Sequence, residues 1–339
     1  MIKQFSIVRF LLVLMIFLHH EGVYQGGGCL AVSAFFILGG ICMALGYGPQ
    51  VVKDDFSYLA FLKRRAVKFY PLHWICLLSV MIPIWYHGWS YNNHALLANF
   101  LLLQSWIPID DFYFSFNAVS WYLSDTFFVS MIFPLLYAFL RKIGKKDRVF
   151  VLVLVVCLYV IMMFAVPSTY SVQHAVLYIH PVSRAIEFVI GIFIAEFYKL
   201  LKGKEKVELM VRNHGVLVDV GMVFFFLLSV AISVGLPRNL FAAYYWPALA
   251  CFFLSVMLLG DTKLDGFMRH EKIQLLTRCT FSFFLIHQRV IGYVGINNGL
   301  WGMGRLAEII VAFLVSYLLA QVLYFLVEKK LTQWLLKRL

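Results

Sequence analysis

The length of its apolar runs constrains this chain more than any other feature. The runs 149–166 and 215–235 each reach roughly the 18–20 residues that a helix needs to cross a hydrocarbon core. The chain is 62% hydrophobic and only 14% charged, and a water-soluble protein needs far more charge on its surface. The sequence therefore predicts an all-α, polytopic membrane helix bundle and excludes an ordinary soluble fold.

Apolar windows and their flanks predict about ten membrane-spanning helices. A further apolar piece, Leu96–Trp106, is too short to cross and is expected to be interfacial or re-entrant. Arg9 interrupts the first run and no small-residue cleavage site follows it, so we expect a retained helix rather than a signal peptide. Residues 1–339 are expected to form a single domain. The predicted spans lie near residues 5–20, 29–47, 70–86, 119–139, 149–166, 182–198, 215–235, 241–259, 280–296 and 306–327.

The basic residues predict the orientation of the bundle. Of the 29 Lys and Arg residues, 24 fall in loops on one side of the ten-span arrangement. The loops of the opposite side contain only Arg238 and Arg305. By the positive-inside rule both termini are predicted to be cytoplasmic. This rule also accounts for the net charge of +12, so we expect membrane lipid, and no nucleic acid, as a partner.

The six cysteines give no sign of a disulfide framework or a metal site. They form no CxxC motif, and most of them lie within apolar stretches. Buried cysteines of this kind behave as small hydrophobic residues. No metal is therefore predicted.

Two ionisable residues in the first span carry the clearest functional signal. Arg9 and His20 are eleven residues apart, which places both side chains on one face of a helix, about 16 Å apart along its axis. An inner cation can hold an anionic or carbonyl-bearing donor, and an outer imidazole can take a proton from a hydroxyl group. The alternative is an arginine that snorkels inward and a histidine at the interface. The residues alone leave both interpretations open.

A basic segment precedes the third span. Lys63, Arg64, Arg65 and Lys68 lie just before Pro71. Clustered guanidinium and ammonium groups suit phosphates, but they also anchor spans and contact anionic lipid head groups. On charge alone the second interpretation is favoured.

Six motifs, in order and spread over nearly the whole chain, resemble those of the acyltransferase-3 family of integral membrane acyltransferases. Each motif is weak alone, but their order makes the resemblance specific. They are Arg9-x10-His20; the block Ala31–Gly40; the segment Phe61–Pro71; Ser120-Trp121-Tyr122-Leu123-Ser124 followed by Pro134; Pro181-x2-Arg184-x2-Glu187-Phe188-x2-Gly191; and Ser282–His287.

This resemblance implies a function and a set of site residues. Members are ten-helix bundles that use acyl-CoA, often acetyl-CoA, to modify surface or exported glycans. It implies that Arg9 and His20 are essential and that the basic segment, through Arg64, Arg65 and Lys68, receives the phosphates of the donor. It also implies a place in the plasma membrane, in bacteria the inner membrane, with glycans such as lipopolysaccharide O-antigen as acceptors.

The chain departs from the family pattern at several positions. Lys68 replaces a second arginine, Gly39 stands where serine is usual, and Ser33 stands where aspartate is common. After Trp121 many members carry a glutamate, whereas here the carboxylate nearest to that place is Asp125. No catalytic role is assigned to Asp125.

Three further polar residues lie within predicted spans and are candidates for contact with the acceptor. Arg184 and Glu187 are three residues apart on one helix, so we expect an ion pair, which could be structural or could bind substrate. His287 lies among phenylalanines. We expect it to be hydrogen-bonded to a backbone carbonyl, and an acceptor-site role stays open.

The segment from Tyr86 to Tyr122 has the composition of a sugar-binding surface. It is rich in aromatic residues, with Asn and Asp between them and without Lys or Arg. Flat rings suit stacking on a sugar, and short amides and carboxylates suit its hydroxyls. An aromatic belt at the membrane interface would explain the rings but not the amides and carboxylates. We predict that this segment forms much of the acceptor site, with Trp106, Asp110, Asp111 and Trp121 as contacts.

Two other functional classes are compatible with part of this pattern. A secondary transporter would also carry ionisable residues within its spans, but it usually shows two related halves, and we find no internal symmetry. A purely structural subunit would not need Arg9 and His20 on one face. No serine lies in a nucleophile-elbow context, so no covalent acyl-serine is predicted.

Overall fold

The computed structural model describes residues 2–167, 169–235, 241–260 and 262–338, and these residues form helices and connecting loops without a β-strand. Arg238, assigned above to the outer side, lies outside the described residues. The helices are α1 (Phe5–His20), α2 (Gly27–Gly46), α3 (Gly48–Val51), α4 (Tyr58–His87), α5 (Asn93–Phe100), η1 (Gln104–Trp106), α6 (Asp110–Tyr113), η2 (Ala118–Ser120), α7 (Trp121–Lys142), α8 (Lys145–Ala165), α9 (Tyr170–Gln173), η3 (His174–Ile179), α10 (Pro181–Leu201), α11 (Glu205–Asn213), α12 (Gly215–Gly235), α13 (Phe241–Leu258), α14 (Lys263–Arg269), α15 (Glu271–Thr277), α16 (Thr280–Trp301), α17 (Arg305–Leu323), η4 (Tyr324–Leu331) and α18 (Thr332–Leu336).

The predicted membrane helix bundle is confirmed in its architecture. By length and composition the described residues include 6 helices that could each cross a membrane, or up to 9 if each bent pair counts as one span. The shorter apolar helix α1 is additional to these. The exact number of ten and the cytoplasmic placement of both termini stay predictions. The piece Leu96–Trp106, expected to be too short to cross, forms α5 and η1 rather than a spanning helix.

The outer helices have the surface expected of helices in contact with lipid. In α8 and α12 only 11% of the apolar window is buried within the protein. A helix that is apolar all round but mostly unburied is stable only where hydrocarbon surrounds it. These two helices therefore support a membrane setting independently of their length.

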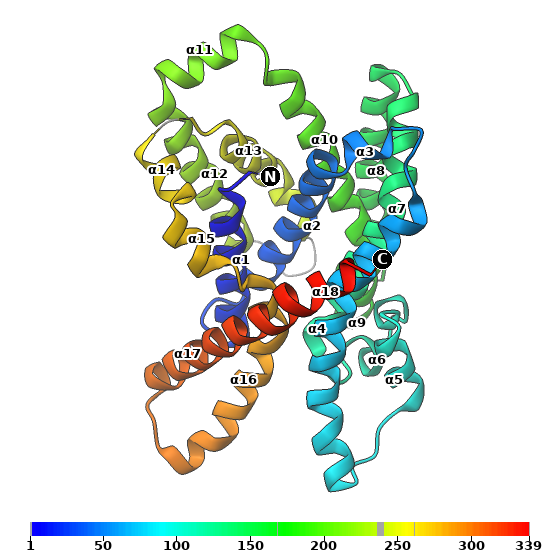
Figure 1. The fold of residues 1–339 in the computed structure, drawn as a ribbon, viewed down its shortest axis with the longest axis vertical. Coiled ribbons are helices and arrows are strands. Elements are labelled where there is room, and N and C mark those ends of the chain that lie inside the picture. Colours follow the sequence, from blue (N-terminus) through cyan, green and yellow to red (C-terminus); the bar gives the residue numbers. More distant parts are fainter. Residues whose placement is uncertain (1, 168, 236–240, 261, 339) are drawn as a thin grey trace.

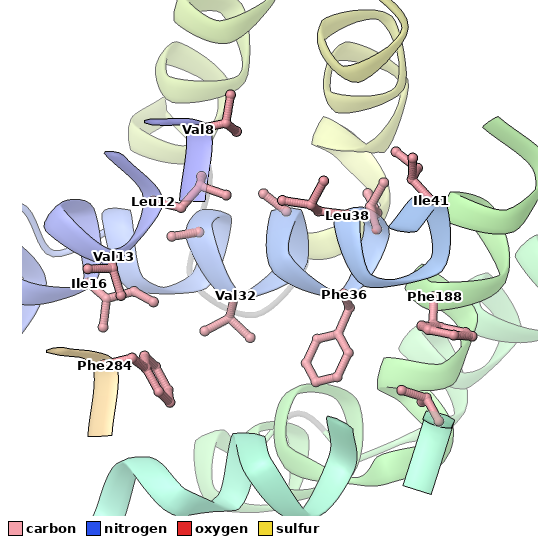
Figure 2. Packing of buried hydrophobic residues seen from close by; sticks show 14 of the residues in the cluster. Val8, Leu12, Val13, Ile16, Val32, Phe36, Leu38, Ile41, Phe188 and Phe284 are labelled. Carbon is pink, nitrogen blue, oxygen red and sulfur yellow. The ribbon is translucent and has the colours of Figure 1, made fainter. Parts of the chain in front are cut away.

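Helix α2 lies in the middle of the bundle, with α1 and α13 on one side and α10 and α7 on the other (Figure 1). Its closest neighbour is α10, because Gly40 and Gly191 let the two backbones touch. Figure 2 shows part of the resulting core, with Phe36 of α2, Phe188 of α10 and aliphatic side chains of α1 and α2. This contact holds α10, which carries Arg184 and Glu187, against α2.

Helix α4 begins earlier than the predicted third span. It starts at Tyr58, where Ser57 accepts a hydrogen bond from the backbone nitrogen of Ala60 at 3.3 Å. The basic segment is therefore helical and not a loop. Because successive residues on a helix differ in direction by about 100°, its cations point to different sides of α4.

Candidate functional site

Helix α1 carries Arg9 and His20 at its two ends, and each contacts a different helix. The Nη2 of Arg9 lies 3.0 Å from the Sγ of Cys42 in α2. The Nδ1 of His20 lies 2.8 Å from the Nε2 of His287 in α16. Gly22, whose φ of +74° favours glycine, ends the helix directly after these residues. Both residues lie on one helix, and their placement on the same face of it stays a prediction.

His287 is fully buried and is held from both sides of its ring. Its Nδ1 lies 2.8 Å from the carbonyl oxygen of Phe284 and 3.2 Å from that of Phe283. The expected hydrogen bond to a backbone carbonyl is therefore present. Its other nitrogen contacts His20, so a single histidine joins the backbone of α16 to the end of α1.

His20 lines a cavity of about 720 Å³. The walls come from the end of α1, the start of α2, η2 and the first residue of α7, and the segment from Tyr170 to Arg184. Among the described residues its lining includes Trp121, Tyr178 and Arg184, but no Asp or Glu. These residues present aromatic rings, histidines and the guanidinium group of Arg184 to a ligand.

A π-helix shapes one wall of this cavity. Residues His174–Ile179 form η3, and the side chains of His174 and Tyr178 both line the cavity. The ring of Tyr178 lies 5.2 Å from that of Trp121. Single π-turns are frequent at functional sites, because the extra residue redirects side chains.

Three buried polar atoms in the cavity wall have no hydrogen-bond partner among the described residues. They are the Nδ1 of His19, the Oε1 of Gln173 and the Nε of Arg184. Buried polar groups are normally paired, since leaving one unpaired costs about 1–3 kcal/mol. An oxygen acceptor, a guanidinium donor and an imidazole nitrogen are thus left for a bound molecule.

The predicted ion pair of Arg184 and Glu187 forms at 2.8 Å, with both side chains buried. Further hydrogen bonds complete it, because Arg184 donates to the carbonyl of Leu177 and Glu187 accepts from the indole nitrogen of Trp246. Arg184 also donates to Ser33, at the position where the family often has aspartate. The pair links α2, α10, α13 and η3 beside the cavity.

At the other end of α1, three cations lie near one another. The charge of Lys68 interacts with those of Arg65 and Arg9, and with the carboxylate of Glu328. Arg65 is buried and donates to the hydroxyl of Ser130 at 3.0 Å. Among the described residues, none of the three cations forms an ion pair within 4.0 Å. The structure thus brings Arg9 together with two predicted donor-binding residues.

Arg64 points elsewhere on α4. It lines a second cavity of about 300 Å³ together with Tyr47, Gln50 and Lys53. Tyr47 also interacts with Arg65, so it lies between the second cavity and the three cations. The basic segment therefore contributes Arg64 to the 300 Å³ cavity and contributes Arg65 and Lys68 to the neighbouring group of cations.

The predicted acceptor segment contributes to the 720 Å³ cavity only with its C-terminal part. Trp121 lines the cavity, whereas Trp106, Asp110 and Asp111 do not. Trp106 packs edge-on against Phe128 at 4.7 Å between ring centroids. Asp110 accepts a hydrogen bond from the hydroxyl of Tyr113 at 2.5 Å, and burial together with this bond raises the pKa of Tyr113.

Some residues of the site escaped sequence reasoning. His174 and Gln173 lie in a stretch that reads as a connecting loop, and no motif marks the π-helix. His19, the residue before His20, lines the same cavity. Asp125 is fully buried on α7 and does not line the cavity. Among the described residues, no three His, Cys, Asp or Glu side chains are grouped as a metal would require.

Comparison with known proteins adds two findings. A family model described as "Acyltransferase domain" matches residues 2–325. The acyltransferase MdmB of Streptomyces mycarofaciens is 35% identical over 126 residues, which cover 35% of this chain and 31% of that relative. The chain thus matches about a third of that relative's length. No solved structure matches the chain.

Proposed function

Since the chain belongs to the acyltransferase family whose model matches residues 2–325, we propose that it transfers an acetyl group from cytoplasmic acetyl-CoA to a hydroxyl of a cell-surface or exported glycan. We further propose that it works in the plasma membrane, in bacteria the inner membrane. The acyltransferase activity follows from the family, and the donor, the acceptor and the location are the proposal.

One observation carries the proposal most directly. A single helix joins an unpaired cation cluster to a histidine that lines a cavity. Arg9 lies in the cluster, and His20 lies about 16 Å further along α1. An acyl-CoA donor requires its phosphate-binding cations and its catalytic base to be well separated. Its charged nucleotide and its reacting thioester carbonyl are at opposite ends of a long, flexible arm.

The cation cluster suits the phosphates of the donor. The charge of Lys68 is repelled by those of Arg9 and Arg65, and charge within a membrane is costly unless it is balanced. The carboxylate of Glu328 balances part of it, and an anionic ligand would balance the rest. Arginine binds phosphate oxygens in a bidentate manner, so Arg64 in the 300 Å³ cavity is a further contact for the nucleotide.

The reaction we propose is direct transfer. His20 takes the proton of an acceptor hydroxyl, and the oxygen attacks the thioester carbonyl. The carbon–sulfur bond breaks, the CoA thiolate leaves, and His20 returns the proton to it, giving an ester and free CoA. The lining of the 720 Å³ cavity supports a carbohydrate acceptor, because rings such as Trp121 offer stacking surfaces and Gln173 an open acceptor atom.

The test of this function uses membranes that contain the protein. They are incubated with acetyl-CoA labelled in its acetyl group and with isolated surface polysaccharide, and label in the polysaccharide is counted. Label that exceeds the background of a protein-free membrane supports the proposal. If the polysaccharide gains no acetyl label, but glycan that was labelled beforehand crosses the membrane, the chain is a transporter.

For the donor site, we expect Arg64→Ala to raise the KM for acetyl-CoA about tenfold, since a hydrogen bond to a charged group contributes about 1.5–3 kcal/mol. The KM for the acceptor should not change. Lys63→Ala is the matched control, because Lys63 is also an exposed cation of this segment but does not line the 300 Å³ cavity. Equal donor KM values for both variants would contradict this assignment.

For the acceptor site, we expect Gln173→Leu to raise the acceptor KM by roughly fivefold to tenfold, because it removes the amide while keeping much of the volume. The donor KM should stay as in the wild type. Asp111→Asn decides between two locations, since Asp111 lies in the segment predicted from composition but outside the cavity lining. A rise in acceptor KM for Asp111→Asn alone would move the acceptor site to the outer segment.

A further inference from the structure

The contact between His20 and His287 determines which nitrogen of His20 can act as the base. The two rings meet through the Nδ1 of His20 and the Nε2 of His287, 2.8 Å apart. A hydrogen bond between two neutral imidazoles needs one N–H donor and one bare nitrogen. The direction of this bond follows from the surroundings of His287.

The other nitrogen of His287 settles that direction. Its Nδ1 lies 2.8 Å and 3.2 Å from two backbone carbonyl oxygens, those of Phe284 and Phe283. Carbonyl oxygens only accept, so Nδ1 must carry the proton. His287 is fully buried, and no carboxylate is among its hydrogen-bond partners in the described residues, so the neutral imidazole is the form that this site favours. Its Nε2 is then bare and accepts.

We infer that His287 is a positioning residue that holds His20 in the Nδ1–H tautomer and leaves its Nε2 free as the base. This inference rests on the proposed function for its catalytic meaning. When His20 takes a proton from the acceptor hydroxyl at Nε2, its Nδ1–H becomes a charge-assisted donor to His287, and such hydrogen bonds are roughly twice as strong as neutral ones. The contact therefore orients the base and stabilises its protonated form, as a second group does for the histidine of other catalytic dyads and triads.

The aromatic surroundings of His287 keep this arrangement rigid. The ring of Phe283 lies nearly parallel to that of His287, with 6.0 Å between centroids and 7° between planes. Phe17 of α1 packs against the same ring. Neither neighbour offers a polar atom, so the imidazole of His287 has its best partners in the two carbonyls and in His20.

A matched pair of variants tests the inference. Glutamine and methionine have similar length and volume, but only glutamine can present an oxygen acceptor near the place of the Nε2 of His287. We expect His287→Met to lower kcat by about 10²-fold, within the range for general acid–base catalysis, with both KM values within a factor of two of the wild type. His287→Gln should recover at least tenfold of that loss. Equal kcat values for the two variants, or a loss confined to KM, would overturn the inference.

A second measurement does not depend on activity or on either variant. Nitrogen-15 NMR of the wild-type protein with labelled histidine distinguishes protonated from bare ring nitrogens, and His20→Asn identifies the signals of His20. We expect a protonated Nδ1 and a bare Nε2 in His20. A bare Nδ1 and a protonated Nε2 would refute the inference even if the protein transfers acetyl groups. The expected pattern would support the assigned tautomer even if no acetyl transfer is found.

Discussion

Replacing His20 by alanine is expected to lower kcat for acyl transfer by about 10³–10⁴-fold, which removes nearly all detectable transfer. The imidazole lines the 720 Å³ cavity and is joined by a hydrogen bond to the buried His287. General acid–base catalysis contributes about 10²–10⁴-fold. The upper part of that range applies here, because His287 holds the imidazole of His20 in position.

The measurement compares transfer of labelled acetyl groups from acetyl-CoA to glycan in membranes with equal amounts of each variant. His19→Ala is the matched control, because His19 is the neighbouring residue and lines the same cavity but does not contact His287. We expect it to change the acceptor KM and to keep kcat within a factor of three. If His20→Ala keeps more than a tenth of the wild-type kcat, the base is another residue.

The sequence was sufficient to predict what depends on local pattern. The bounds of α1 and α12 coincide with the predicted spans, because long apolar runs with polar flanks leave little choice. The Arg184–Glu187 pair was predictable for a similar reason, since a spacing of three places two residues on one side of a helix. These features need no knowledge of how helices pack.

The rest of the site depends on contacts between segments that are distant in the chain. His20 and His287 are 267 residues apart and meet only because α1 packs against α16. Arg64 and Arg65 look equivalent in the sequence, yet the early start of α4 gives them separate surroundings. The π-helix His174–Ile179 brings His174 into the cavity. The sequence of this short, mostly apolar segment has no periodicity that would predict a π-helix.

Composition predicted a sugar-binding segment but could not say which of its residues face a cavity. The aromatic and acidic residues of this segment also stabilise the segment itself, as Tyr113 and Asp110 do through their hydrogen bond. Among the described residues only its C-terminal part, from Phe114 to Trp121, reaches the cavity lining. An amphipathic pattern would have shown which side chains face the protein interior. The helices α5, η1 and α6 are too short to show such a pattern.

Replacing Gly40 by alanine is expected to destabilise the bundle more than any other single-methyl change on α2. A Cβ at Gly40 would lie 2.0 Å from the carbonyl oxygen of Phe188 and 2.9 Å from the nitrogen of Ile192, which are backbone atoms of α10. Gly191 is in the reciprocal position, since its Cβ would lie 2.0 Å from the carbonyl oxygen of Ile37. A side chain can rotate away from such a clash, but a helix backbone must move as a whole.

The separation of α2 from α10 would also disturb the site. Ser33 on α2 accepts a hydrogen bond from Arg184 on α10, beside the cavity. We therefore expect Gly40→Ala to cost on the order of 3 kcal/mol, the upper part of the usual range for overpacking. This corresponds to a decrease of roughly 5 °C or more in the midpoint temperature of unfolding. Activity should be lost already below the lowered midpoint, because the site is disturbed before the bundle unfolds.

Thermal unfolding of the purified protein in detergent, followed by size-exclusion chromatography after heating, measures this effect. The adjacent Gly39→Ala is the matched control, because a Cβ there would lie 3.6 Å from the ring of Phe188, which is ordinary van der Waals contact. The same methyl group is added one residue away, so helix propensity changes equally in both variants. Equal midpoints for the two variants would mean that α2 and α10 do not touch through their backbones, and that another contact holds Arg184 beside the cavity.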